Sequence, residues 1–466
     1  MNLNITEIAK AIKGEILKDK NTDTKDIIIK NIITDSREVL NDSLFFALKG
    51  EIFDGHDFTH RAVENGVIAI VVNKDYALRE NLSDNTIVIA VEDTGLAFLD
   101  LAKYYKSLFE LEFTVGITGS NGKTTVKEFT HAVLSQKYKA RKTEGNFNNE
   151  VGMPKTIFNL QQDERVLVLE MGMNHFGEIS RLSKSAEPDI GIVNNIGTNH
   201  IENLGSREGI KQAKCEIMDG MSANSTIILN ADEPLLYCEK GKTGKREVFF
   251  GIENRNADVI AADISYDYDA NVSFFEIDGT RFKIPVVGLH NVYNAIPAYI
   301  CGKICGLSDE MIQAGYNNFE NVKMRQNIYE FHGITIIDDC YNASLESVRA
   351  GLAVLAQMPN TNNQGKKIAV LSDVLECGDF ADDIHTKIGE ALLENNIDVV
   401  YAYGDKSKHI ADVVAKAKGA CFYFEDKAHI AEKLFEEAKN QGTVVLFKAS
   451  RGMAIETVLE DFKKLF

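Results

Sequence analysis

The chain has 466 residues, which is more than one compact core accommodates, so we expect about three domains. Hydrophobic residues make up 44% of the chain and charged residues 26%, a composition that excludes an intrinsically disordered protein. The formal net charge of −18 argues against a nucleic-acid-binding surface, although small anions need only a few local cations and amides.

Seven cysteines are scattered along the chain without a Cys-x-x-Cys pair, as is usual for proteins of a reducing cytosol. Cys301 and Cys305 lie at helical spacing, and we expect buried thiols there rather than half of a metal site. Residues 1–7 have neither the basic nor the apolar part of a signal peptide, and no apolar stretch is long enough to span a membrane. We therefore expect a cytoplasmic protein without a membrane span.

Residues 1–109 are predicted to form a small α/β domain. Short apolar runs at 27–29, 44–47, 67–72 and 87–91 alternate with polar turns, which is typical of strands. A further apolar strand begins near Glu112 and opens a second domain, which we predict to span residues 110–321.

The second domain contains the most informative stretch of the chain, Gly-Ile-Thr-Gly-Ser-Asn-Gly-Lys-Thr-Thr at 116–125. Because it joins a predicted strand to a predicted helix, a bound phosphate would meet a helix N-terminus. The glycines let backbone amides approach phosphate oxygens, the lysine supplies a mobile positive charge, and the threonine hydroxyl can contact Mg²⁺. Ile117 stands where the longer phosphate-loop pattern has glycine, so the pattern is the shorter Gly-x-x-Gly-Lys-Thr. The predicted nucleotide-binding residues are Gly119, Ser120, Asn121, Gly122, Lys123, Thr124 and Thr125.

Three further polar residues of the same domain are candidates for the site: two follow predicted strands and one lies on a predicted helix. Ligands bind beyond the carboxyl ends of parallel strands, so Glu170, after the apolar run 166–169, could hold Mg²⁺; the alternative is a solvated acid. His200 follows the apolar run 190–193 and could equally be a loop or capping histidine. Lys214 lies on a predicted amphipathic helix, where taken alone it would be a surface lysine.

The remaining chain is predicted to complete a three-domain α/β fold. Residues 251–287 are rich in β alternation, 291–304 are helical, and 317–324 are a candidate hinge. Strands at 334–337, 368–371, 399–402 and 444–447 alternate with helical patterns, which predicts a Rossmann-like, doubly wound domain over 322–466. The central parallel-sheet domain would be of the phosphate-loop ATPase type.

Together the phosphate loop, Glu170, His200 and Lys214 resemble the ATP-dependent Mur ligases, and the resemblance extends over all three segments. It implies catalytic roles for Lys123, Glu170, His200 and Lys214, and two Mg²⁺ ions held by Thr124, Glu170, His200 and Lys214. It further implies that CO₂ carbamylates Lys214, which turns a cation into a carboxylate-like ligand. ATP would convert a substrate carboxylate into an acyl phosphate, which an amine then attacks. A monomer is usual in this family.

Several stretches are most similar to the family member that adds D-alanyl-D-alanine to UDP-N-acetylmuramoyl-tripeptide. Asp338-Asp339-Cys340-Tyr341-Asn342-Ala343 resembles its signature, whereas the Asp-Asn-Pro-Arg motif of the amino-acid-adding member is missing. The resemblance assigns further nucleotide contacts to Asn291, Asn294, Arg325 and Asp339. It assigns substrate contacts to Ser36, Arg37, Asn146, Asn149, Tyr341, Asn342, Ser344, Lys448 and Ser450. Helix capping is the alternative for the four asparagines at 146, 149, 291 and 294, and a surface ion pair is the alternative for Arg37.

The chain departs from the family pattern at several positions. Ser344-Leu345 replaces Asn-Pro, while Met324, Ser372 and Ala449 replace glycines, which is tolerable unless φ is positive there. Two other functions stay open: a folylpolyglutamate synthetase-like ligase, which lacks a first domain of this kind, and a non-catalytic ATP-binding module.

Overall fold

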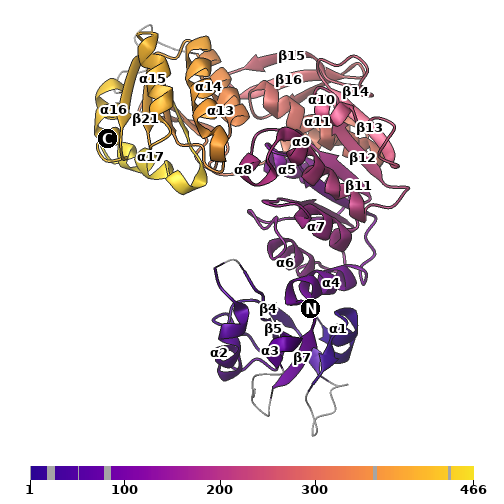
Figure 1. The fold of residues 1–466 in the computed structure, drawn as a ribbon. Coiled ribbons are helices and arrows are strands. Elements are labelled where there is room, and N and C mark those ends of the chain that lie inside the picture. The colour runs from indigo at the N-terminus through magenta and orange to yellow at the C-terminus, as the bar shows by residue number, and fades with distance from the viewer. Residues whose placement is uncertain (1, 18–26, 51, 78–85, 360–364, 439–441) are drawn as a thin grey trace.

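The computed structural model describes residues 2–17, 27–50, 52–77, 86–359, 365–438 and 442–466. Figure 1 shows three α/β domains, with the N-terminal and C-terminal domains at opposite ends of the central one. The predicted three-domain α/β fold is therefore confirmed, while the boundaries at 109/110 and 321/322 stay predictions. No helix among the described residues is long and apolar enough to cross a bilayer.

The N-terminal domain is built on a sheet of order β2-β7-β6-β5-β4, parallel except for β2. Strands β5 and β7 are buried at every residue, as expected where helices cover a parallel sheet. The elements are β1 (Leu3–Asn4), α1 (Ile5–Ala11), β2 (Glu15–Ile16), β3 (Ile28–Ile29), β4 (Asn31–Ile33), β5 (Ser43–Phe46), η2 (Gly55–Phe58), α2 (Thr59–Glu64), β6 (Ala69–Asn73), α3 (Lys74–Ala77), β7 (Ile87–Val91) and α4 (Thr94–Lys106).

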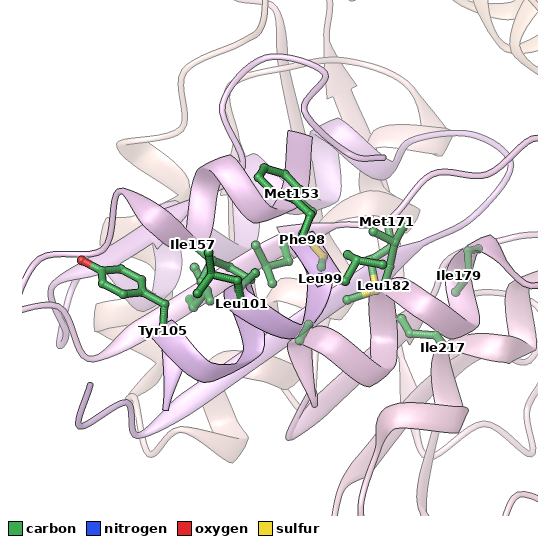
Figure 2. Packing of buried hydrophobic residues seen from close by; sticks show 14 of the residues in the cluster. Phe98, Leu99, Leu101, Tyr105, Met153, Ile157, Met171, Ile179, Leu182 and Ile217 are labelled. Atoms are coloured by element: carbon green, nitrogen blue, oxygen red, sulfur yellow. The ribbon is translucent and has the colours of Figure 1, made fainter. Parts of the chain in front are cut away.

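Helix α4 joins the N-terminal and central domains through one continuous hydrophobic core. Figure 2 shows Phe98, Leu101 and Tyr105 of α4 packed with apolar side chains of α6 (Gly152–Phe158) and α7 (Glu178–Ala186). The Ser185 hydroxyl also donates a 2.8 Å hydrogen bond to the carbonyl of Leu99. Because this shared core excludes water, it stabilises the packing of the N-terminal domain against the central domain.

The central domain contains a seven-stranded parallel sheet of order β14-β13-β12-β11-β8-β10-β9. Strand β8, which leads into the phosphate loop, lies at the point where successive strands are added on opposite sides. The elements besides α6 and α7 are β8 (Phe113–Thr118), α5 (Lys123–Leu134), β9 (Ala140–Lys142), β10 (Val166–Glu170), β11 (Ile190–Val193), α8 (Ile201–Leu204), α9 (Arg207–Cys215), η3 (Glu216–Gly220), β12 (Thr226–Asn230), α10 (Pro234–Tyr237), β13 (Arg246–Gly251) and β14 (Val259–Ile260).

An antiparallel sheet and two helices complete the domain: β15 (Ala262–Asp267), β16 (Val272–Ile277), β17 (Thr280–Ile284), α11 (Leu289–Ile304) and α12 (Asp309–Asn317). Both helices pack on α5. A Cβ on Gly315 would lie 2.5 Å from the Cα of Val133, so this close approach of α12 to α5 needs glycine. Cys301 on α11 and Cys305, which directly follows that helix, are buried free thiols, as predicted.

The C-terminal domain has a six-stranded sheet of order β18-β19-β23-β20-β21-β22, in which only β18 is antiparallel. The predicted doubly wound arrangement is present. The elements are β18 (Asn327–Phe331), β19 (Ile334–Asp338), α13 (Leu345–Gln357), β20 (Lys367–Ser372), η4 (Gly378–Phe380), α14 (Ala381–Glu394), β21 (Val399–Tyr403), α15 (Lys408–Lys416), β22 (Ala420–Phe424), α16 (Ile430–Ala438), β23 (Val444–Lys448), η5 (Arg451–Met453) and α17 (Glu456–Lys463).

Candidate active site

The site forms where three neighbouring strands of the central sheet end. Glu170 of β10 pairs with Ile117 of β8, and Val193 of β11 pairs with Thr118 on the other side. The residues that follow β8, β10 and β11 therefore meet at one edge of the sheet, at a topological switch point. This explains why segments far apart in the sequence converge on one place.

The phosphate loop turns sharply at its two inner glycines. Gly119 has φ +153° and Gly122 has φ +78°, and a Cβ on Gly122 would lie 2.2 Å from Oδ1 of Asn294. The loop is held from the β11 side, where the carbonyl of Asn195 accepts from the Ser120 amide (3.1 Å). Its shape is therefore set by protein contacts, as a preorganised anion site requires.

Lys123 begins α5 and folds back over this loop. Its Nζ donates hydrogen bonds to the carbonyls of Gly119 (2.9 Å) and Ser120 (3.3 Å). Burial lowers the pKa of Lys123, and the negative charge of Glu170 opposes that shift. The side chain thus lies over the loop that would hold the phosphates.

Glu170 is buried, with about 2% of its surface exposed, so the solvated-acid alternative is wrong. Its Oε2 accepts from the Thr124 hydroxyl (2.9 Å) and its Oε1 accepts from Nδ2 of Asn148 (2.8 Å). The ammonium of Lys127, itself buried, lies 4.0 Å from Oε2. Glu170 is therefore a buried, oriented carboxylate that touches the phosphate loop.

Lys214 is buried in α9, with 2% of its surface exposed, so the surface alternative is wrong. Within the described part of the chain, no carboxylate pairs with it and no hydrogen bond engages its Nζ. Burial holds its pKa well below the usual value, and the positive charge of Lys123 adds to the shift. Burial of this kind favours the uncharged, nucleophilic form of the amine.

His200 lies at the junction of the central and C-terminal domains. Its Nδ1 is 2.7 Å from Oε2 of Glu376, which is carried by the loop between β20 and η4. The contact with the His200 ring lowers the pKa of Glu376. His200 immediately precedes α8, but its side chain makes no capping hydrogen bond, so the capping alternative is wrong.

A cavity of about 500 Å³ opens between the central and C-terminal domains. It is lined by residues 120–125 and by the predicted residues Glu170, His200, Asn291, Asn294, Arg325, Asp339, Tyr341, Asn342 and Lys448. A second cavity of about 90 Å³ adjoins it and is lined by Asn342, Ser344 and Ser450 among others. Lys214 lines neither cavity, and no group of three His, Cys, Asp or Glu side chains in the described ranges could hold a metal ion alone.

The C-terminal domain brings two paired cations, Lys448 and Arg325, to the larger cavity. Nζ of the buried Lys448 donates to Oδ2 of Asp339 (2.5 Å) and to the Asn342 carbonyl (3.0 Å). The guanidinium carbon of Arg325 lies 3.8 Å from the ring centroid of Tyr341, a cation–π contact. The structure thus pairs two predicted nucleotide contacts with two predicted substrate contacts.

Ser344 and Ser450 both make structural hydrogen bonds as well. Ser344 caps α13 by accepting from the Ser347 amide (3.2 Å), and its hydroxyl lies 3.0 Å from Oδ1 of Asn121 in the phosphate loop. The Ser450 hydroxyl accepts from the Leu375 amide (2.9 Å). The first residues of α13 therefore sit directly against the phosphate loop.

A hydrogen bond at a helix start accounts for one of the predicted asparagines. Asn149 accepts from the amide of Gly152 (2.8 Å), the first residue of α6, although the N-cap of that helix is Val151, and neither Asn146 nor Asn149 lines either of the two cavities. Asn291 and Asn294 lie inside α11, whose N-cap is Gly288 without a side-chain cap, so capping is wrong for both.

Two predicted substrate residues lie in the N-terminal domain and line neither cavity. Ser36 is buried, and its carbonyl accepts from Nδ2 of Asn65 (2.8 Å). The exposed Arg37 pairs with Asp35 at 2.6 Å and lowers the pKa of that carboxyl to about 2, as the ion-pair alternative requires.

Of the three positions where glycine is replaced, only Met324 has a positive φ, +63°. Gln326 follows at φ +49°, so Arg325 is flanked by two left-handed residues. The expectation that the replacement is tolerable is met at Ser372 and Ala449 and fails at Met324, where the backbone is strained.

Sequence reasoning missed several residues at the site. Asn148, which donates to Glu170, is the direct neighbour of the predicted contact Asn149. Glu376, which contacts His200, lies four positions after Ser372, one of the departures from the family pattern. Asn194 follows β11 directly and donates to Oδ1 of Asn294 (2.8 Å), so the strand-end rule could have found it.

Sequence models of protein families match three parts of the chain. Residues 28–112 match "Mur ligase family, catalytic domain", 117–302 match "Mur ligase middle domain", and 324–451 match "Mur ligase, glutamate ligase domain". The curated UDP-N-acetylmuramoyl-tripeptide–D-alanyl-D-alanine ligase of Bacillus subtilis (strain 168) is 37% identical, over 98% of this chain and 97% of its own length.

Solved structures agree with these matches. A crystal structure of MurF from Acinetobacter baumannii superposes with a TM-score of 0.89 at 29% identity and covers 100% of this chain and 99% of its own. MurF ligase from Thermotoga maritima, in complex with ADP, has a TM-score of 0.82 at 32% identity and covers 94% and 98%.

Proposed function

The chain belongs to the Mur ligase family, and from that premise we propose that it joins D-alanyl-D-alanine to the terminal carboxylate of UDP-N-acetylmuramoyl-tripeptide. ATP is converted to ADP and phosphate in this reaction, which completes a precursor of the peptidoglycan cell wall. The observation that carries the proposal is the meeting of the phosphate loop, the buried Glu170 and the C-terminal domain around one cavity.

The chemistry begins with two anions that repel each other. A carboxylate needs a better leaving group before an amine can displace its oxygen, so the tripeptide carboxylate attacks the γ-phosphorus of ATP and ADP leaves. The amine of D-alanyl-D-alanine then attacks the acyl phosphate and releases phosphate. Lys123 and the amides at the start of α5 would face the charge that develops in the first step, and preorganised donors of this kind are usually the largest single contribution to catalysis.

Magnesium ions fit the donor set that the structure provides. Thr124 and Glu170 offer a hydroxyl and a carboxylate that already touch, and His200 lines the same cavity. Bound Mg²⁺ would neutralise phosphate charge there. We propose two ions, since the phosphate loop and the carboxylate-binding side each bring ligands. Phosphate oxygens would supply the rest, because the side chains of the described residues alone form no complete cluster.

Carbamylation of Lys214 fits its surroundings. The reaction needs an uncharged amine, which attacks CO₂ and loses a proton to give a carbamate anion. Lys214 is buried and lacks an acidic partner among the described residues, and burial lowers its pKa, so its surroundings favour the uncharged amine. A carbamate at this position would also balance the charge of Lys123.

Substrates are proposed to span the three domains. The small cavity beside Asn342, Ser344 and Ser450 is suited to D-alanyl-D-alanine, with Tyr341 and Lys448 close by. Asn291, Asn294, Arg325 and Asp339 line the larger cavity and are proposed to contact the nucleotide. Ser36 and Arg37 would bind the UDP end of the tripeptide, and Asn146 and Asn149 its middle.

Three further properties are proposed on the same basis. Residues 317–324, which follow α12, would be the hinge about which the C-terminal domain moves. The enzyme would work in the cytoplasm, where its nucleotide-linked substrates are made, and as a monomer.

The experiment that tests this function is phosphate release from ATP with each substrate omitted in turn. We expect release only when the nucleotide-linked tripeptide and D-alanyl-D-alanine are both present, and none from Lys123→Ala. Release with folate and glutamate would favour the folylpolyglutamate synthetase alternative. ATP binding without any release would favour the non-catalytic module.

A further inference from the structure

One contact links the candidate metal site to the other domain. His200 belongs to the central domain, and Nδ1 of its ring lies 2.7 Å from Oε2 of Glu376, which belongs to the C-terminal domain. The two atoms are close enough for a hydrogen bond, but the angle at Nδ1 is unsuitable, so Nδ1 has no hydrogen-bond partner. Contacts of this kind in active sites commonly straighten only when substrates bind.

Both partners are held by unusual backbone. His200 and Glu376 each have φ +61°, in the left-handed region that residues other than glycine rarely adopt. Such conformations cost free energy and persist where the surroundings require them, often at functional sites. The two loops are also pressed together next to the pair, because a Cβ on Gly378 would lie 3.1 Å from Cγ of Glu202.

The contact has a chemical consequence for the imidazole. A neutral histidine carries its proton on one nitrogen and can bind a metal ion only with the other. A carboxylate at Nδ1 favours the Nδ1–H tautomer, which leaves the lone pair on Nε2. Within the described residues no side chain or backbone group engages Nε2, and the residue lines the larger cavity.

We propose that Glu376 is a positioning residue for His200. It holds the imidazole in the Nδ1–H tautomer and fixes the ring so that Nε2 can bind a divalent cation. Because Glu376 is carried by the C-terminal domain, the ligand is fully oriented only when that domain is docked on the central one. When the C-terminal domain docks, it therefore brings its substrate pocket to the central domain and completes the metal site in the same movement. The proposal rests on the proposed function of His200 as a metal ligand.

The first test reads the tautomer directly. ¹⁵N NMR of the His200 ring, assigned with a His200→Asn sample, is recorded for the wild type and for Glu376→Ala with ADP and Mg²⁺. We expect the Nδ1–H form in the wild type and a shift toward the Nε2–H form, which free histidine favours, in the variant. Identical ring signals in the two proteins would overturn the proposal.

The second test measures metal affinity. Titration of Mn²⁺ in the presence of ADP should show binding weakened on the order of 10-fold in Glu376→Ala, as is usual when a partner of a metal-binding histidine is lost. Glu376→Gln keeps the shape and the acceptor oxygen but not the charge, so it should fall between the two. Unchanged Mn²⁺ affinity in both variants would contradict the proposal.

Controls separate this role from folding and from the proposed reaction. Asp383→Asn removes an exposed carboxylate of the same domain that pairs with Lys387 within α14, and it should alter neither the tautomer nor the Mn²⁺ affinity. Glu376→Gln, being isosteric, provides the test if Glu376→Ala does not fold. The reaction itself is tested independently by phosphate release in the wild type, so Glu376 can prove irrelevant while the ligase activity stands.

Discussion

The hydroxyl of Thr124 donates a 2.9 Å hydrogen bond to Oε2 of Glu170. Thr124 is the second residue of α5 and Glu170 is the last residue of β10, so the contact ties the phosphate loop to the neighbouring strand end. A hydroxyl and a carboxylate at this separation can turn to share one cation. The fold itself therefore holds the two groups together.

This contact predicts how Thr124 responds to substitution. Thr124→Val removes the hydroxyl and keeps the shape, and we expect activity to fall on the order of 10- to 100-fold. Thr124→Ser keeps the hydroxyl and should stay close to the wild type. Phosphate release measured against Mg²⁺ concentration checks both, with the main loss expected at low Mg²⁺. Equal activity of Val and Ser variants would mean that the hydroxyl plays no part.

Lys214 is predicted to act through an added carboxylate rather than through its ammonium. Lys214→Ala should lose most activity, and short carboxylic acids such as acetate should restore part of it by occupying the space of the carbamate. Chloride at the same ionic strength is the control, because it changes screening without supplying a carboxylate. Normal activity of the variant without any acid would remove Lys214 from the site.

The burial of His385 leads us to expect that the C-terminal domain loses stability as the pH falls. Its ring is fully buried, Nε2 accepts from the Val374 amide (3.0 Å), and Nδ1 lies 2.6 Å from the Ala381 carbonyl, so the neutral form fits. Burial lowers its pKa below 6.5. Below pH 6.5 the unfolded chain therefore binds a proton that the folded chain resists, and stability is lost as pH falls, at up to about 1.4 kcal/mol per pH unit.

The measurement is urea unfolding between pH 7.5 and pH 5. The variant His385→Gln, which cannot be protonated, should show a smaller loss of unfolding free energy over this interval than the wild type. Parallel curves for the two proteins would show that His385 does not cause the acid sensitivity.

The strained backbone at Met324 should make two substitutions there differ in their effect on stability. Its φ of +63° costs an ordinary residue about 1–2 kcal/mol, and a β-branched residue more. Met324→Gly should therefore leave the urea midpoint nearly unchanged, because lost packing offsets relieved strain, whereas Met324→Val should lower it clearly. If both variants unfold at the same midpoint, the left-handed conformation is not maintained in solution.

Local patterns were enough to predict part of the site. The phosphate loop is a contiguous motif between a strand and a helix, so Gly119, Gly122 and Lys123 could be assigned from the sequence. Glu170 followed from the rule that ligands bind at strand ends, because the apolar run 166–169 is easily recognised.

Other features depend on packing that no local pattern encodes. The burial of Lys214 arises from what α9 packs against, and an amphipathic pattern alone places a lysine on the surface. Asn148 was missed because its neighbour Asn149 is the same residue type, and in the structure Asn149 binds the first amide of α6 while Asn148 binds Glu170. Glu376 contacts His200 across a domain interface, 176 positions along the chain, which only the folded structure reveals.

The acyl phosphate is the central intermediate of the proposed reaction, and an isotope label tests it most directly. UDP-N-acetylmuramoyl-tripeptide with ¹⁸O in its terminal carboxylate is converted with ATP and D-alanyl-D-alanine, and the released phosphate is analysed by mass spectrometry. We predict one ¹⁸O atom in each phosphate, because the carboxylate oxygen that attacks phosphorus leaves with it. Product formed with unlabelled phosphate would show that the carboxylate never bonds to phosphorus, and the mechanism would be wrong.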